Sequence, residues 1–149
     1  MKIADLIPEV SNRIFLLENV DKKIKGISAI FLHELSKTNS DAESLMLTMP
    51  AFRKLLEKSN NEDFGIALLA LLFRPEVNFL KFEYFFIDDS TNDNDGEIGT
   101  VSHEDVLRAE EIGYLNNPIT KDDDYDYRRK IYPSLIVTED YLNTYQEGK

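Results

Sequence analysis

The sequence predicts an α+β fold, in which about four helices form an N-terminal bundle and about three strands form a small antiparallel sheet with one inserted helix. Two patterns support this prediction. Apolar residues recur at spacings of three and four in the first half of the chain, as in helices that bury one face. Aromatic and β-branched residues alternate with polar ones in parts of the second half, as in strands. We therefore expect a single domain over residues 1–149, with a helical half (1–75) and a sheet-containing half (76–149).

Two helices are expected before residue 40. Pro8 suits the first turn of a helix that ends near Glu18, because its missing N–H falls where helical donors have no partner. From Val20 to Leu35 the apolar residues lie three and four apart. This spacing predicts a second helix that ends near Lys37.

Two more helices are expected between residues 40 and 73. Ser40 and Glu43 have the spacing of a capping box, in which each side chain accepts a hydrogen bond from the other residue's backbone. A third helix should begin there, with a kink or a restart at Pro50. The apolar run Phe64–Phe73 predicts a fourth helix that is buried on all sides and central to the core.

A hairpin is expected at the start of the second half. Val77–Ile87 is rich in aromatic and β-branched residues and predicts a strand. The following segment, 88–96, is polar and turn-forming. Glu97–Val101 should then return as the antiparallel partner.

A short acidic helix is expected after the hairpin. Ser102 is suited to cap it, and Gly113 is suited to end it, which gives His103–Ile112 as its bounds. The polar segment Asn116–Asp126, which contains a run of three aspartates, predicts a second loop.

One more strand and a helical turn are expected near the end of the chain. Ile131–Val137 has the composition of a strand. Pro133 cannot donate a backbone hydrogen bond, so we expect this strand at an edge of the sheet. Thr138, which two acidic residues follow, is suited to start a terminal helical turn.

The excess negative charge lies in one stretch of the chain. Residues 88–126 hold thirteen Asp and Glu residues and two basic residues, while the rest of the chain holds fifteen acidic and fifteen basic residues. The net charge of −11 is therefore concentrated in a local negative surface. Such a surface attracts a cationic partner and repels nucleic acid.

The composition excludes several function classes. The chain has no cysteine, so disulfides, thiol nucleophiles and cysteine-based metal sites are ruled out. Residues 1–17 lack the uninterrupted apolar core of a signal peptide, and the longest apolar run has ten residues, about half of a bilayer span. We therefore expect a soluble cytoplasmic protein with no cofactor, no bound metal and no membrane partner.

The tip of the predicted hairpin resembles part of a calcium-binding loop. Thr91, Asp93, Asp95 and Gly96 place oxygen ligands on alternate residues before a glycine. The first and last ligand positions of such a loop do not match, because Thr91 and Ser102 occupy them in place of acidic residues. A solvated tip is the preferred interpretation, and calcium binding stays open as the alternative.

Acidic and aromatic residues alternate in the second loop. An arginine that docks there can pair with a carboxylate and stack on a tyrosine ring. The alternative is a loop that only faces water, partly neutralised by Arg128, Arg129 and Lys130. The candidate partner-binding residues are Asp122, Asp123, Asp124, Tyr125, Asp126 and Tyr127, together with Tyr114, Asp88 and Asp89.

Two other function classes have weaker support. His103, flanked by a serine and two acidic residues, is the candidate base of a small hydrolase, but adjacent residues do not form a catalytic triad. The order helix, turn, helix, hairpin is also that of a winged helix. Its DNA-recognition helix would be residues 62–73 or residues 103–112. The first is almost wholly apolar, and the carboxylates of the second repel phosphates.

The sequence therefore favours a non-enzymatic protein-binding module that docks an acidic surface on a basic protein surface. An inhibitor, an immunity-type protein or a mimic of nucleic-acid charge would work in this way. Direct binding of nucleic acid is not expected. A winged-helix regulator and a hydrolase that uses His103 with loop carboxylates are the alternatives, and a homodimer is left open.

Overall fold

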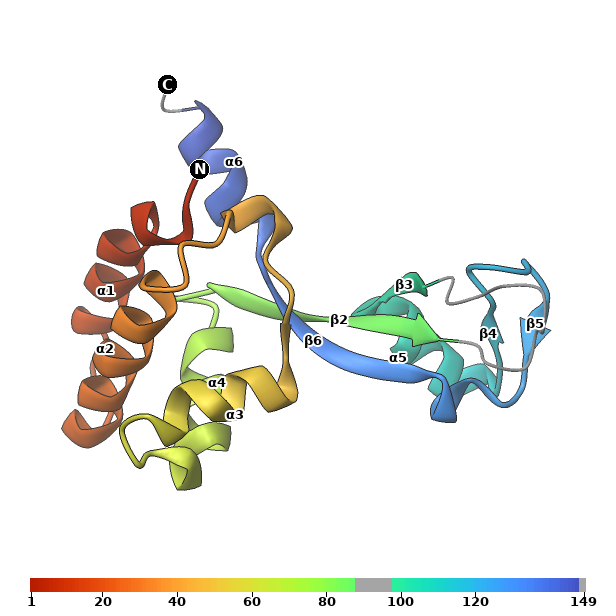
Figure 1. The fold of residues 1–149 in the computed structure, drawn as a ribbon, viewed down its shortest axis with the longest axis horizontal. Coiled ribbons are helices and arrows are strands. Elements are labelled where there is room, and N and C mark those ends of the chain that lie inside the picture. Colours follow the sequence, from red (N-terminus) through yellow and green to blue (C-terminus); the bar gives the residue numbers. More distant parts are fainter. Residues whose placement is uncertain (88–97, 148–149) are drawn as a thin grey trace. The chain divides into compact units, whose positions relative to one another are not determined.

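The structure is a computed structural model that describes residues 1–87 and 98–147, and it confirms the α+β class (Figure 1). These ranges contain six α-helices, a four-stranded sheet and a two-stranded sheet. The helices are α1 (Ile7–Phe15), α2 (Lys22–Ser36), α3 (Met49–Glu57), α4 (Gly65–Phe73), α5 (His103–Ile112) and α6 (Glu139–Glu147). The strands are β1 (Leu47–Thr48), β2 (Leu80–Ile87), β3 (Ile98–Ser102), β4 (Leu115–Asn116), β5 (Asp123–Asp124) and β6 (Ile131–Val137).

The chain divides into two compact units. The helical unit comprises Met1–Lys81 and Leu135–Lys149, and the acidic unit is Phe82–Ser134. The acidic unit holds fourteen Asp and Glu residues and five Lys and Arg residues, whereas the helical unit holds fourteen and twelve. Most of the net negative charge therefore belongs to the acidic unit.

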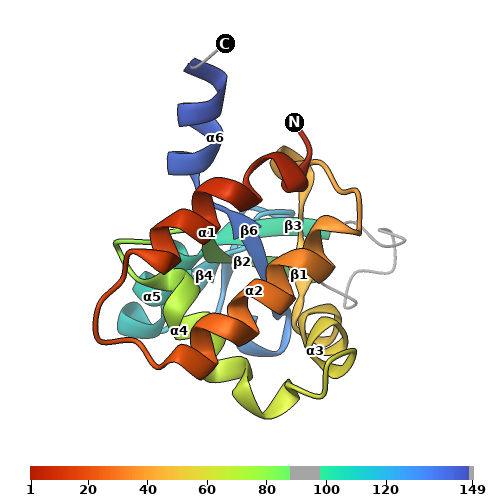
Figure 2. The same cartoon turned by 90° about the vertical axis from the view of Figure 1, so that its left-hand side faces the viewer.

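The first two helices of the helical unit form where they are predicted and lie side by side (Figure 2), although α1 ends at Phe15, before the predicted Glu18. The Asp21 carboxylate accepts a hydrogen bond from the Lys23 amide at 2.7 Å and caps α2. Both helices bury one apolar face, as their spacing predicts. The residues buried on them are Val10, Ile14, Ile27, Ser28, Phe31, Leu32 and Leu35.

The third helix begins later than predicted. Thr48 caps α3, because its hydroxyl accepts a hydrogen bond from the amide three residues later at 3.3 Å. Pro50 consequently lies in the first turn of α3 and does not kink it. The capping-box residues are used differently, because the Ser40 carbonyl accepts a hydrogen bond from the Ile3 amide at 2.8 Å and only a 3-10 turn, Ala42–Ser44, follows.

The prediction that the apolar fourth helix is central to the core is wrong. Only one face of α4, formed by Leu68, Leu71 and Leu72, is buried. Ile66 is 87% exposed on the opposite face, where two alanines are exposed as well. Periodicity cannot identify the outer face of a helix that has apolar residues all round.

The larger sheet has the strand order β1-β6-β2-β3. Strands β2 and β3 pair antiparallel, with Tyr84 opposite Val101, so the predicted pairing is confirmed, although β2 begins at Leu80, later than the predicted Val77. Strand β6 has the predicted bounds, but it lies between β1 and β2, so the prediction of an edge strand is wrong. Its neighbour β1 has only two residues, whereas β6 has seven, so β1 can pair with only part of β6, which suits Pro133.

The acidic unit has its own apolar core beneath α5. Ser102 accepts a hydrogen bond from the Asp105 amide at 3.2 Å at the start of this helix, and Gly113 ends it with a φ of 90°. The predicted helix is therefore confirmed at both ends. The buried core residues are Phe86, Val101, Val106, Ala109, Leu115 and Tyr127.

The second loop contains a short antiparallel ribbon that the sequence did not predict. Its strands are β4 and β5, with Leu115 opposite Asp124. The buried Asn117 side chain shapes the turn between them, because its carbonyl oxygen accepts hydrogen bonds from the Ile119 and Thr120 amides at 2.8 and 3.1 Å. Pro118, in the same turn, packs directly over the backbone of Gly99 in β3.

Among the described residues, no helix has the length and apolar character that crossing a bilayer requires.

We predict that Gly99→Ala destabilises the protein by roughly 1–3 kcal/mol, the usual cost of overpacking. A Cβ at this position would lie 2.7 Å from Pro118 Cγ, and a proline ring cannot rotate away. Urea unfolding measures the change. Gly26→Ala is the control, because a Cβ there meets no atom within 4 Å in α2 and should stabilise by about 0.5–1 kcal/mol. Equal midpoints for the two variants would contradict the close packing at Gly99.

Candidate protein-binding site

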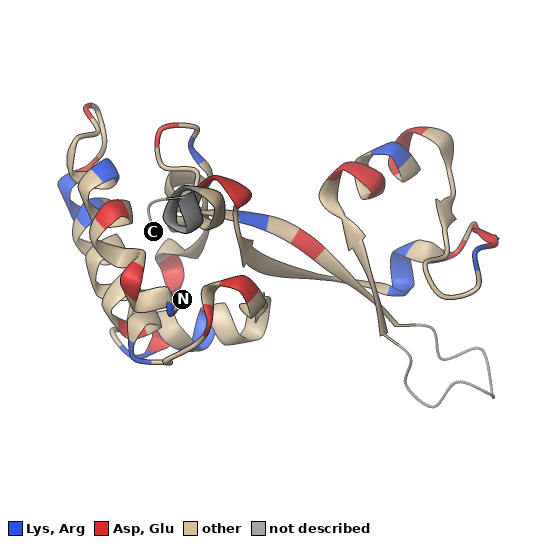
Figure 3. Cartoon of the chain, turned by 90° about the horizontal axis from the view of Figure 1, so that it is seen from above, with Lys and Arg blue, Asp and Glu red and all other residues tan. Residues whose placement is uncertain are grey.

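Three consecutive basic residues each bind a carboxylate of the acidic unit, whose charges are coloured in Figure 3. The pairs are Arg128 with Glu110 (2.8 Å between Nη2 and Oε2), Arg129 with Asp126, and Lys130 with Asp124 (2.7 Å between Nζ and Oδ2). The predicted neutralisation of the loop by these bases is therefore confirmed for two loop carboxylates, Asp124 and Asp126. It leaves the charges of Asp122 and Asp123 uncompensated among the described residues.

Asp124 has a structural role in this segment. Its side chain is only 9% exposed and the Lys130 side chain only 13%, so their ion pair is mostly shielded from water. The second carboxylate oxygen accepts a hydrogen bond from the Asp126 amide at 2.8 Å, which turns the chain after β5. A carboxylate held in this way is not available to a partner.

Tyr127 belongs to the core, which differs from its expected role as a partner-binding ring. The side chain is fully buried, and its hydroxyl donates a hydrogen bond to Glu110 Oε1 at 2.7 Å. Burial and this hydrogen bond both raise the pKa of Tyr127. A tyrosine in this position holds the segment after β5 against α5 and presents no ring to a partner.

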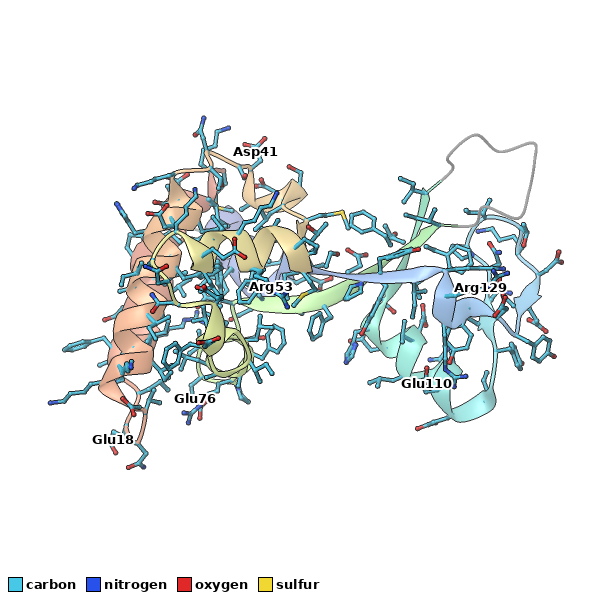
Figure 4. All side chains as sticks on the ribbon, turned by 60° about the horizontal axis from the view of Figure 1, so that its bottom comes forward. Glu18, Asp41, Arg53, Glu76, Glu110 and Arg129 are labelled. Carbon is cyan, nitrogen blue, oxygen red and sulfur yellow. The ribbon has the colours of Figure 1, made fainter. Side chains whose placement is uncertain are left out.

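Glu110, labelled in Figure 4, joins α5 to Tyr127 and Arg128. Its two carboxylate oxygens accept hydrogen bonds from Arg128 at 3.1 and 2.8 Å, in a bidentate arrangement. The Arg128 guanidinium, followed by the Tyr127 hydroxyl, lowers the pKa of Glu110. The sequence does not reveal this pairing, because seventeen and eighteen residues separate the partners.

Asp122 and Asp123 remain exposed. The turn that carries Asp122 is fixed by its own backbone, since the Asp122 carbonyl accepts a hydrogen bond from the Asn117 amide at 2.8 Å. The Asn-Pro dipeptide at 117–118 is the sequence signal for this turn. The two carboxylates are thus presented on a turn and strand of defined shape.

A pair of tyrosines, one of them exposed, accompanies these carboxylates. The rings of Tyr114 and Tyr125 lie 5.4 Å apart between centroids, with 49° between their planes. Tyr125 is 72% exposed, while Tyr114 is half-buried. The pair offers an aromatic face on which a guanidinium can stack.

A groove of about 450 Å³ passes between α5, β3 and the ribbon, within the acidic unit. Its charged lining residues are Asp105, Arg108 and Asp123, and Tyr114 contributes an aromatic wall. Arg108 and Asp105 approach to 3.8 Å on the surface, a pair that contributes little in water. The groove therefore offers two carboxylates and one tyrosine to an incoming side chain. Sequence analysis missed Asp105, which appeared there only as one acid of the predicted helix.

The remaining candidates lie outside the described residues. These are Asp88 and Asp89, together with the calcium-like residues Thr91, Asp93, Asp95 and Gly96. Within the described parts of the chain, no group of three or more Asp, Glu or His side chains is arranged to hold a metal ion.

His103 contacts aromatic residues of β2. Its Nδ1 atom lies 3.3 Å from the Tyr84 hydroxyl, and the two rings are stacked with 6.0 Å between centroids. Phe82 packs nearby, at 5.9 Å from the imidazole. The structure thus places two aromatic rings of β2 beside the imidazole.

The two helices considered for base reading expose side chains that are unsuited to phosphates. Helix α4 exposes Ile66 and two alanines, and α5 exposes Glu104, Asp105 and Glu111. Binding to duplex nucleic acid depends on cations that neutralise its phosphates. The single Lys or Arg residue of these two helices, Arg108 of α5, lies 3.8 Å from the Asp105 carboxylate.

Comparisons of the chain with protein-family models, with curated proteins and with solved structures found no match.

We predict that Glu110→Gln lowers stability at neutral pH but not in acid. The folded pKa of Glu110 is depressed, so its contribution to the free energy of unfolding is present above the unfolded pKa, about 4.3. The contribution is lost as the pH falls through the lower folded value. Urea midpoints at several pH values measure it. Glu111→Gln, an exposed neighbour, is the control, and a Glu110→Gln deficit unchanged from neutral to acid pH would refute this linkage.

We also predict that Lys130→Met destabilises the protein by roughly 3 kcal/mol, because it leaves the Asp124 carboxylate poorly solvated and without its cation. Asp123→Asn, one residue away on the exposed surface, should change the free energy of unfolding by no more than about 0.5 kcal/mol. Thermal or urea unfolding distinguishes the two. Similar small effects for both variants would show that Asp124 is no more structural than its neighbour.

Proposed function

We propose that the chain is a cytoplasmic, non-enzymatic protein-binding module whose acidic unit docks on a basic protein surface. It would act as an inhibitor, an immunity-type protein or a mimic of nucleic-acid charge, by covering the cationic site of its partner. One observation carries the proposal: exposed carboxylates at Asp122 and Asp123, which have no ion-pair partner among the described residues, accompany the half-buried Tyr114 and the exposed Tyr125 beside a groove.

The charge of the acidic unit suits a cationic partner. This unit contains fourteen acidic residues and only five basic ones, and four of those bases already pair with carboxylates within it. The remaining negative charge attracts a basic surface over a distance of about 8 Å at physiological ionic strength. Electrostatic attraction of this kind raises the association rate and disfavours acidic partners.

The tyrosines suit arginine in particular. A guanidinium can bind a carboxylate with two parallel hydrogen bonds and stack on an aromatic ring, whereas an ammonium acts as a point charge. Tyr125 offers an exposed ring beside Tyr114, and Asp123 lines the groove with Tyr114. These features support an arginine-rich surface as the partner, with Tyr125 as the principal aromatic anchor.

Matched charge variants test the site against simple net charge. Asp122→Asn with Asp123→Asn removes two carboxylates at the site, and Glu104→Gln with Glu111→Gln removes two exposed carboxylates of α5 that do not line the groove. We expect proteins captured by the wild type at low salt to be lost with the first pair and at high salt. The second pair should retain them.

Tyr125→Ala tests the contribution of the aromatic ring in the same experiment. Loss of an aromatic anchor should weaken binding of the captured partner by about tenfold or more, with little effect on folding because the ring is 72% exposed. Equal capture by the wild type and by both the Asp122/Asp123 and the Tyr125 variants would rule out this site.

A further inference from the structure

A second groove, in the helical unit, lies between α3 and α4 and has no role in the function proposed above. Its volume is about 510 Å³. Met49 and Pro50 of α3 and Ile66 and Leu69 of α4 are among its lining residues. Figure 2 shows the two helices following one another around a short turn.

The rim of this groove exposes apolar surface. Ile66 is 87% exposed although it lies in the most apolar helix of the chain. Burial of an isoleucine side chain contributes about 1.5–3 kcal/mol, and a contiguous exposed apolar patch commonly marks an interaction site. The outer face of α4 therefore gains stability if another surface covers it.

Both charge signs line the groove. Arg53, labelled in Figure 4, Lys54 and Glu57 lie on α3, whereas Glu62 and Asp63 lie at the turn before α4. None of these five side chains forms an ion pair within the described parts of the chain, although charged residues nearby do. Those neighbouring pairs are Lys58 with Glu34 at 3.6 Å and Lys37 with Glu34 at 3.2 Å.

This arrangement is complementary to itself. In a twofold-symmetric dimer, a patch that meets its own copy brings residue i against j and j against i. The basic side chains of one copy would then meet the acidic side chains of the other twice, once on each side of the axis. The helical unit suits such an approach, since its acidic and basic residues nearly balance, at fourteen and twelve.

We propose that the α3–α4 groove binds the same groove of a second copy, with Ile66 of each copy buried against its partner and with Arg53 and Lys54 paired to Glu62 and Asp63 across the twofold axis. The charge pattern favours a second copy over an occupant of a single charge sign, because both signs, two basic and three acidic side chains, are present on one surface. The interface is separate from the acidic surface, so either proposal can fail without the other.

Reciprocal charge reversal tests the interface. Arg53→Glu with Lys54→Glu makes the rim wholly acidic, and Glu62→Lys with Asp63→Lys makes it basic at the same positions. Each variant alone should be monomeric, because like charges meet across the axis. Mixed in equal amounts, the two should form a heterodimer, which sedimentation velocity of the full-length chain detects.

Ile66→Asp tests the apolar contact. It should lower the association constant by at least about tenfold, while Phe15→Asp, at a position that is 76% exposed away from the groove, should leave it unchanged. Circular dichroism melting checks that each variant is folded. A monomeric wild type over the whole concentration series, or a dimer that persists in Ile66→Asp and in both charge reversals, would overturn the proposal.

Discussion

The structure depends on the pairing of β2 with β6, two strands that are separated by more than forty residues of sequence. Each strand contributes residues to both compact units. At one end the Thr138 amide donates a hydrogen bond to the Phe79 carbonyl at 3.0 Å, and at the other the Ile87 amide donates to the Lys130 carbonyl at 2.8 Å. Everything between these strands in sequence, including the acidic segment, is therefore an insertion closed by one long-range backbone pairing.

The two units differ in how their charges are balanced. In the helical unit, the core includes the buried Tyr141, whose hydroxyl donates a hydrogen bond to the Val77 carbonyl at 2.7 Å. Arg13 stacks on the same ring and pairs with both Glu9 and Asp140. The acidic unit has a smaller core and a large excess of carboxylates. Mutual repulsion lowers the stability of such a unit, and the three bases at 128–130 offset part of it.

Local signals predicted the elements whose ends are set by neighbouring residues. The Ser102 cap and the Gly113 stop gave α5 its correct bounds, and composition alone gave those of β6. The prediction failed where two local signals competed, as when Thr48 rather than Ser40 capped the third helix. It also failed for the β4–β5 ribbon, because its two-residue strands depend on the Asn117 turn and on close packing at Gly99.

The candidate site shows the same limit at the level of single side chains. Charge counting located the acidic segment, but it could not separate Asp123, which is exposed, from Asp124, which binds Lys130. Tyr125 and Tyr127 likewise appear equivalent in an alternating sequence. The chain turns after β5, where the Asp124 carboxylate accepts the Asp126 amide hydrogen bond. One ring therefore points outward and the other is buried.

The buried interactions give the exposed ones their value for binding. A flexible acidic loop would lose conformational entropy on association, and that loss subtracts from affinity. Here Tyr127, Asp124 and their partners hold the segment in the folded protein, so Asp122, Asp123 and Tyr125 are presented on a backbone that is already ordered. The carboxylates that the three bases neutralise thus contribute to recognition indirectly, by fixing the position of those that remain charged and exposed.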